Sequence, residues 1–82
     1  MNYELFKARK EARLTQAAVA KKSRIRRERY NQIELNKTKP TFDEAILIGK
    51  AVNKQPNELF LVDDVRVNHN EQTVDFQEAA NV

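Results

Sequence analysis

Apolar residues recur at helical spacing in several short stretches over the first sixty residues. In the first stretch, Leu5, Ala8 and Ala12 follow the i, i+3, i+7 spacing that places side chains on one face of an α-helix. Asn2 precedes this stretch and is a candidate N-cap. The sequence therefore predicts a helix from about Tyr3 to Ala12.

Two more short helices are predicted directly after the first. The hydroxyl of Thr15 can cap a helix over 16–22, whose small residues let another helix cross closely. A third helix over about 27–35 would turn Tyr30 and Ile33 towards the core. Its remaining faces carry arginine, asparagine and glutamine, which are side chains suited to reading base edges in a DNA major groove.

A capping box marks the start of a fourth helix. Thr41 can cap it, and Glu44 three residues later can reach back to the Thr41 amide. We expect this helix to span about 42–52, and close helix packing or simple tolerance would explain Gly49 in its interior. A proline at the start of 56–60 lacks the amide that a first helical turn leaves unpaired, which predicts a fifth helix there.

The pattern changes after Val62. Residues 63–76 show weak two-residue alternation around an asparagine-rich centre, which predicts a short hairpin or an extended arm. The last residues have the composition of a frayed or disordered end. We therefore expect an all-α domain over 1–62 and an acidic tail over 63–82, which would be a dimerisation arm or disordered.

The length and composition narrow the class of protein. Eighty-two residues are enough for one domain, and without cysteine there is no disulfide and no thiolate metal site. No apolar run approaches the roughly 18 to 20 residues that cross a bilayer, and no charged-then-apolar leader opens the sequence. We expect a cytoplasmic protein with no membrane, cofactor or small-molecule partner.

The net charge of +3 conceals a strong asymmetry. Residues 1–62 hold 14 of the 15 Lys and Arg and 7 of the 12 acids, giving +7, whereas residues 63–82 carry −4. Eight basic residues and two acids fall within 21–39. Such a cluster is typical of a surface that binds a polyanion, because neutralising phosphates releases counterions. Taken alone, it is equally compatible with a solvated surface that keeps the protein soluble.

The sequence contains no recognisable motif of catalytic or metal-binding residues. His69 is the single histidine and lies among asparagines, which is typical of a loop residue rather than a metal ligand or general base. No cysteine, second histidine or glycine-rich phosphate loop accompanies it. We therefore do not expect an enzyme.

Many correctly spaced positions from Leu5 to Phe60 resemble the lambda-repressor-like helix-turn-helix superfamily, the Cro and repressor class known as the XRE family. The match is ungapped and covers about two thirds of the chain. It includes Leu5, Arg9, Leu14-Thr15-Gln16, Val19-Ala20-Lys21-Lys22, Ile25, Ile33-Glu34, Lys37, Pro40 and Glu58-Leu59-Phe60. The resemblance implies a five-helix domain whose third helix enters the major groove. It also implies an ion pair between Arg9 and Glu34 that ties the first helix to the third.

The third helix supplies the candidates for reading bases. Arg27 can pair with the O6 and N7 of guanine, and Gln32 suits adenine. Glu28 can accept from cytosine N4 or instead pair with Arg24 at i−4. The alternative for Arg27 is a phosphate contact or a solvated charge, and for Arg26, Asn31 and Gln32 it is solvent exposure. The full set is Arg26, Arg27, Glu28, Asn31 and Gln32.

A second set would contact the DNA backbone without reading sequence. The resemblance places Gln16 at a helix N-terminus that points its amides at a phosphate, and places 36–39 in the loop that touches the backbone. Surface charge is the alternative role for the basic members. The candidates are Thr15, Gln16, Arg24, Arg29, Asn36, Lys37, Thr38 and Lys39.

Several positions depart from the family pattern. Arg13 and Arg24 stand where glycine is usual, so the turn after the second helix is either strained or differently shaped. Arg26 replaces the usual Ser or Thr cap of the third helix and has no hydroxyl with which to cap it. Leu35-Asn36 replaces the usual Asn-Gly.

Together these features predict a sequence-specific double-stranded DNA-binding regulator, a small phage or mobile-element repressor of the Cro type. It would act as a homodimer on operator half-sites about one helical turn apart. The alternative is a protein-interaction module, an antitoxin or regulator-binding partner, with the acidic tail as a docking arm. The apolar candidates for a dimer contact, which could instead complete the core, are Leu59, Phe60, Leu61, Val62, Val65 and Val67.

Overall fold

A computed structural model describes residues 1–66 and shows five α-helices followed by a short 3-10 helix. The helices are α1 (Tyr3–Glu11), α2 (Gln16–Lys22), α3 (Arg27–Glu34), α4 (Phe42–Val52) and α5 (Pro56–Leu59), and the 3-10 helix η1 spans Val62–Asp64. The predicted all-α, five-helix fold is confirmed. No helix among these 66 residues is long and apolar enough to cross a membrane.

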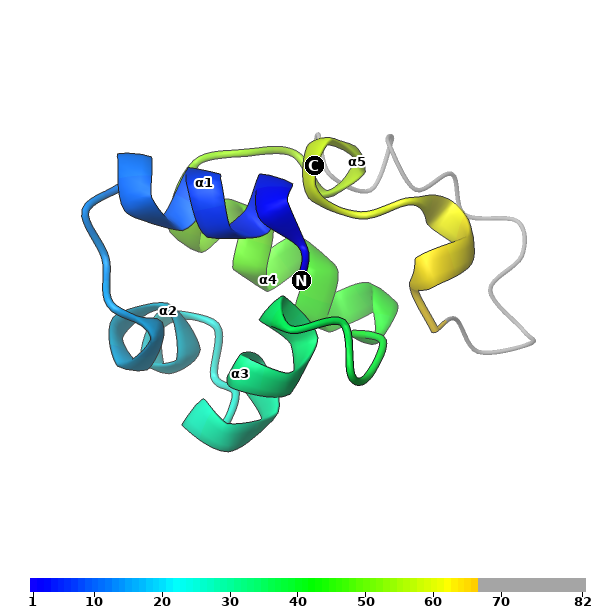
Figure 1. Ribbon diagram of the computed structural model, residues 1–82, viewed down its shortest axis with the longest axis horizontal. Coiled ribbons are helices and arrows are strands. Elements are labelled where there is room, and N and C mark those ends of the chain that lie inside the picture. Colours follow the sequence, from blue (N-terminus) through cyan, green and yellow to red (C-terminus); the bar gives the residue numbers. More distant parts are fainter. Residues whose placement is uncertain (67–82) are drawn as a thin grey trace.

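Helix α4 is the centre of the fold, and α1, α2 and α5 each pack against it (Figure 1). It is the longest helix and contributes four buried residues to the interior. Helix α3 packs mainly against α2, on the side of the molecule away from α5. The apolar core consists of Leu5, Ala8, Val19, Ala20, Tyr30, Ile33, Ala45, Ile48, Val52, Leu59, Phe60 and Val65.

Side-chain caps define where the helices begin. The Asn2 side chain accepts a hydrogen bond of 3.0 Å from the Leu5 amide, and the Thr15 hydroxyl accepts one of 3.0 Å from the Ala18 amide. The capping box that opens α4 is complete in both directions. Because these caps are encoded within four residues, the predicted starts are confirmed, and the predicted ends lie within one residue of those observed.

Gly49 is required by close packing rather than tolerated. A Cβ atom at this position would lie 2.5 Å from the carbonyl oxygen of Lys54 and 3.4 Å from the nitrogen of Pro56. The link from α4 to α5 therefore runs directly against this turn of α4, and only a residue without a side chain leaves room for it.

Three non-glycine residues adopt the left-handed backbone at the positions where the family pattern differs. Arg13 and Arg24 both have φ of 59°, and Asn36 has φ of 62°. A left-handed residue with a Cβ costs roughly 1–2 kcal/mol, less for asparagine. The turn after α2 thus keeps the left-handed shape with strain, which decides between the two expectations for Arg24.

The chain after α5 returns to the loop between α3 and α4. Val65 is 6% exposed and completes the core together with Leu59 and Phe60. The Arg66 amide donates to the Pro40 carbonyl at 2.8 Å. Residues 67–76 of the predicted hairpin or arm lie outside the described residues, and the predicted boundary at residue 62 stays a prediction.

Candidate nucleic-acid interface

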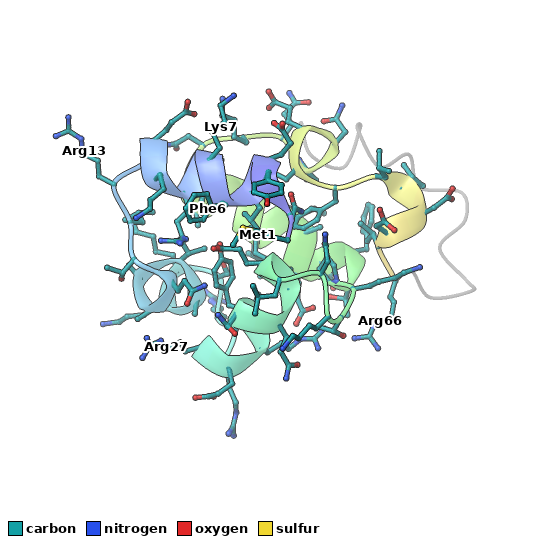
Figure 2. All side chains as sticks on the ribbon, viewed as in Figure 1. Met1, Phe6, Lys7, Arg13, Arg27 and Arg66 are labelled. Carbon is teal, nitrogen blue, oxygen red and sulfur yellow. The ribbon has the colours of Figure 1, made fainter. Side chains whose placement is uncertain are left out.

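Helix α3 has a buried face and a solvent-exposed polar face. Tyr30, Ile33 and Glu34 are at most 1% exposed, because this face lies against the core. The outer face is exposed, and Figure 2 shows Arg27 pointing away from the body of the molecule at one end of α3. The exposed side chains of this helix and its N-cap are Arg26, Arg27, Glu28 and Gln32. Four of the five predicted base-reading residues are therefore free to meet a ligand.

A buried ion pair holds the inner face of α3 to α1. Arg9 Nε donates to Glu34 Oε2 at 2.9 Å, and Arg9 Nη2 donates to Glu34 Oε1 at 3.0 Å. The remaining Arg9 nitrogen, Nη1, donates to the Leu14 carbonyl at 3.0 Å, and the Tyr30 hydroxyl donates to Glu34 Oε2 at 2.6 Å. The ion pair implied by the family resemblance is confirmed. With this geometry both partners have hydrogen bonds in place of water, as a buried pair requires.

Glu34, Arg9 and Tyr30 form a buried polar cluster, and their contacts shift the pKa values of all three side chains. Burial opposes ionisation of Glu34, but hydrogen bonds from Arg9 and Tyr30 outweigh burial and keep the pKa of Glu34 below its ordinary value. The hydrogen bond to Glu34 raises the pKa of Arg9, and burial raises the pKa of Tyr30. Glu34 and Arg9 therefore remain charged at neutral pH.

The polar cluster extends to the start of α2 through Gln16. Gln16 Nε2 donates to Glu34 Oε1 at 3.4 Å, and Asn31 Nδ2 donates to Gln16 Oε1 at 3.2 Å. Both ends of the Gln16 amide are thus engaged, which fixes the side chain between α2 and α3. Asn31, the fifth predicted base-reading residue, is half-buried and engaged with Gln16, whereas Gln32 is exposed.

Arg29 is engaged in a second ion pair. Its Nε and Nη2 atoms lie 2.7 Å from the two carboxylate oxygens of Glu44, and Nη2 also donates to the Lys39 carbonyl at 3.4 Å. The hydrogen bond from Arg29 lowers the pKa of Glu44, which also accepts from the Thr41 amide in the capping box. Arg29 therefore joins α3 to α4 across the intervening loop. Sequence spacing gave no sign of this pair, because its partners are 15 residues apart.

The other phosphate candidates lie around the ends of α2 and α3. Arg24, Asn36, Lys37 and Lys39 are exposed, and Thr38 is half-buried. Lys39 Nζ donates to the Asp63 carbonyl at 2.9 Å, and the Thr15 hydroxyl caps α2. The suggested pair between Glu28 and Arg24 is not formed, since the ion pairs within residues 1–66 are Arg9–Glu34 and Arg29–Glu44.

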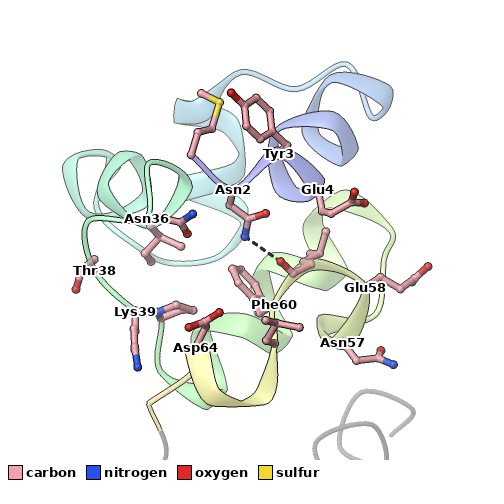
Figure 3. Close-up of a pocket in the computed structure, with 15 residues that line it drawn as sticks. Asn2, Tyr3, Glu4, Asn36, Thr38, Lys39, Asn57, Glu58, Phe60 and Asp64 are labelled. Atoms are coloured by element: carbon pink, nitrogen blue, oxygen red, sulfur yellow. Dashed lines mark hydrogen bonds between the residues drawn. The ribbon is translucent and has the colours of Figure 1, made fainter.

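An open hollow of about 450 Å³ lies beside the loop and α5 (Figure 3). Two of its lining residues are joined by a hydrogen bond of 2.8 Å from Asn2 Nδ2 to the Leu59 carbonyl. Three large exposed apolar side chains border it, namely Met1, Tyr3 and Leu61, and Val62 is exposed next in the chain. No group of three His, Cys, Asp or Glu within 1–66 is arranged to hold a metal ion.

The comparisons with known proteins agree with this geometry. A family model described as Helix-turn-helix matches residues 5–59, which is more than half of the chain and contains α1 from Leu5 onwards and all of α2 to α5. No curated protein and no solved structure matches the chain significantly. The match spans the exposed helix, its buried ion pair and the basic loop. The chain therefore belongs to the helix-turn-helix family of the XRE, lambda-repressor-like type, a family of DNA-binding transcription regulators.

Proposed function

We propose that the protein is a sequence-specific repressor of the Cro type, from a phage or mobile element, that reads operator half-sites in the major groove as a homodimer. It would work in the cytoplasm of a bacterial cell, where occupying the operator blocks polymerase. The observation that carries this proposal is the exposed polar face of α3, held in place from behind by the buried cluster around Glu34.

Base reading is assigned to the outer face of α3. Arg27 is exposed and makes no ion pair within 1–66, so its guanidinium is available for guanine O6 and N7. Gln32 is exposed for adenine, and Glu28 for the N4 amino group of cytosine. Arg26 precedes the helix and makes no capping hydrogen bond, which leaves its side chain for a base or a phosphate. Asn31 would act through Gln16.

Phosphate binding is assigned to the residues that flank α2 and α3. Lys37, Lys39 and Arg24 bring positive charge, and Arg29 holds the loop in place through Glu44. The start of α2 would supply backbone amides and the Gln16 side chain. The uncharged members of this surface are Thr15, Gln16, Asn36 and Thr38.

The homodimer is proposed on the exposed apolar surface beside the hollow. A monomer of this size reads only a few base pairs, and a two-fold dimer doubles the site. Tyr3, Leu61 and Val62 are 72%, 71% and 62% exposed, and apolar groups left this open favour a contact between copies. Sedimentation of the protein alone and with DNA tests this proposal. A protein that stays monomeric on a non-palindromic site would favour the alternative, in which this surface binds a different protein.

Selection of bound duplexes from a random library, followed by fluorescence anisotropy with the selected duplex, tests the proposed function. We expect a palindromic consensus and a log affinity that falls by about 0.9 per log unit of salt for each phosphate contacted. Binding that is undetectable, or unaffected by salt, on every duplex would contradict the proposal.

A further inference from the structure

Arg66 lies beside the basic loop although it is 27 residues away from Lys39 in the sequence. Its amide donates to the Pro40 carbonyl at 2.8 Å, and its carbonyl accepts from the Phe42 amide at 2.9 Å. These two bonds form a parallel bridge with Thr41, which is the N-cap of α4. The backbone of Arg66 is therefore held at the junction of the loop and α4, without help from its side chain.

The direction of the Arg66 side chain follows from its neighbour. Val65 is in the extended conformation, with φ −122° and ψ 133°, and its side chain is buried in the core. Successive side chains of an extended segment point to opposite sides, so Arg66 is directed to solvent. Arg66 is exposed, and Figure 2 shows it projecting from the same edge of the molecule as Arg27, with α3 between them.

The guanidinium of Arg66 is not neutralised within the described part of the chain. The ion pairs there are Arg9–Glu34 and Arg29–Glu44, and neither Asp63 nor Asp64 approaches Arg66 closely enough to form a third. Lys39, the nearest lysine of the loop in sequence, donates its ammonium group to the Asp63 carbonyl. The edge next to the loop thus carries a planar cation that has no ion-pair partner among residues 1–66 and is suited to bidentate contact with a phosphate.

We propose that Arg66 is a further DNA-binding residue, which contacts a backbone phosphate next to the one bound by the loop 36–39. This inference rests on the proposed function and extends its surface beyond the helix-turn-helix unit itself. Arg66 would add affinity for any duplex without adding sequence preference, because a phosphate is the same at every base pair.

Anisotropy titrations of the full chain with the selected duplex and with a scrambled duplex, at several salt concentrations, test this contact. Arg66→Ala should weaken both complexes by about five- to eightfold near 0.1 M salt and reduce the salt slope by about 0.9. Arg66→Lys, which keeps the charge, should recover most of the slope. Lys7→Ala is the matched control, because it removes one positive charge on the far side of the molecule (Figure 2).

The outcomes separate this inference from the proposed function. If the wild-type protein binds with a steep salt dependence but Arg66→Ala behaves like Lys7→Ala, the proposed Arg66 contact is wrong and the proposed function is unaffected. The contact is also wrong if Arg66→Lys binds as weakly as Arg66→Ala, because the charge would then not be the cause. If the wild-type protein binds neither duplex, the proposed function itself fails.

Discussion

The inner and outer faces of α3 carry the same kinds of polar side chain in opposite environments. On the inner face, Glu34 is 1% exposed and accepts hydrogen bonds from Arg9 and Tyr30. On the outer face, Arg27 and Gln32 are exposed, and Arg27 has no ion-pair partner within residues 1–66. One face satisfies its charges inside the protein, and the other leaves them available to a partner.

This difference separates the two tasks of the helix. The buried cluster joins α1, α2 and α3, so it determines how α3 is presented. The exposed face contributes little to stability, because surface charges are solvated whether or not the chain is folded. Substitutions on the inner face should therefore alter folding, and those on the outer face should alter binding alone.

The largest effect is expected from Glu34→Ala. It leaves the buried Arg9 guanidinium and the Tyr30 hydroxyl without their acceptor, and breaking a buried pair costs about 3–5 kcal/mol. In a domain this small, that is a large part of the free energy of unfolding. Urea unfolding followed by circular dichroism measures the change. Glu34→Gln is the control and should lose less, because it keeps an acceptor oxygen; equal, small losses in both variants would contradict the role of the cluster.

A change on the outer face, Arg27→Ala, should leave the unfolding free energy within about 0.5 kcal/mol of the wild type. It should cost about 1–3 kcal/mol of discrimination at one base pair of the operator. Competition titrations with single-base variants of the selected duplex measure this. Lys37→Ala is the matched control and should weaken all variants equally. An unchanged base preference in Arg27→Ala would show that α3 is not oriented as proposed.

Lowering the pH should gradually reduce the free energy of unfolding, because carboxylates that stabilise the folded state become protonated. Burial favours the neutral form of Glu34, but the hydrogen bonds from Arg9 and Tyr30 outweigh burial and hold the pKa of Glu34 below its ordinary 4.5. The hydrogen bond from Arg29 likewise lowers the pKa of Glu44. The unfolded chain therefore binds these protons first, so the stabilisation is complete above pH 4.5 and is lost as the pH falls below it. Unfolding free energies between pH 7 and pH 3 test this, and Glu34→Gln should show a flatter profile. Parallel profiles for the two proteins would exclude a contribution from Glu34.

The smallest effect concerns Arg24, where strain and binding can be separated. Arg24→Gly removes the cost of a left-handed residue and should raise the unfolding free energy by up to about 1 kcal/mol. It also removes a proposed phosphate contact, so DNA affinity should fall. Arg24→Ala should lose the same affinity without the gain in stability, because it keeps the strained φ. A stability gain in both variants would mean that the backbone conformation is not the source of the strain.

Features encoded over a few residues could be predicted from the sequence. The capping box of Thr41 and Glu44 and the hydroxyl of Thr15 act within a single turn, so the helix starts were confirmed. The family pattern, in which the position of Arg24 is normally glycine, identified this turn as unusual but left its shape open, and the structure shows the left-handed form.

Contacts between distant residues could not be predicted in the same way. The pairing of Arg29 with Glu44 and the hydrogen bond between Asn31 and Gln16 each span 15 residues and depend on how the helices pack. The place of Arg66 beside the loop depends on the return of the chain after α5. The roles of the proposed DNA-binding residues stay predictions.

Amide NMR spectra recorded while the protein is titrated with the selected duplex test the central claim most directly, because they report which face meets DNA. The largest shifts should occur over residues 26–32 and 36–39 and at the start of α2, with the exposed face of α1 around Lys7 little changed. Shifts concentrated on α5 and Leu61 with α3 unmoved would contradict the claim that the outer face of α3 binds DNA.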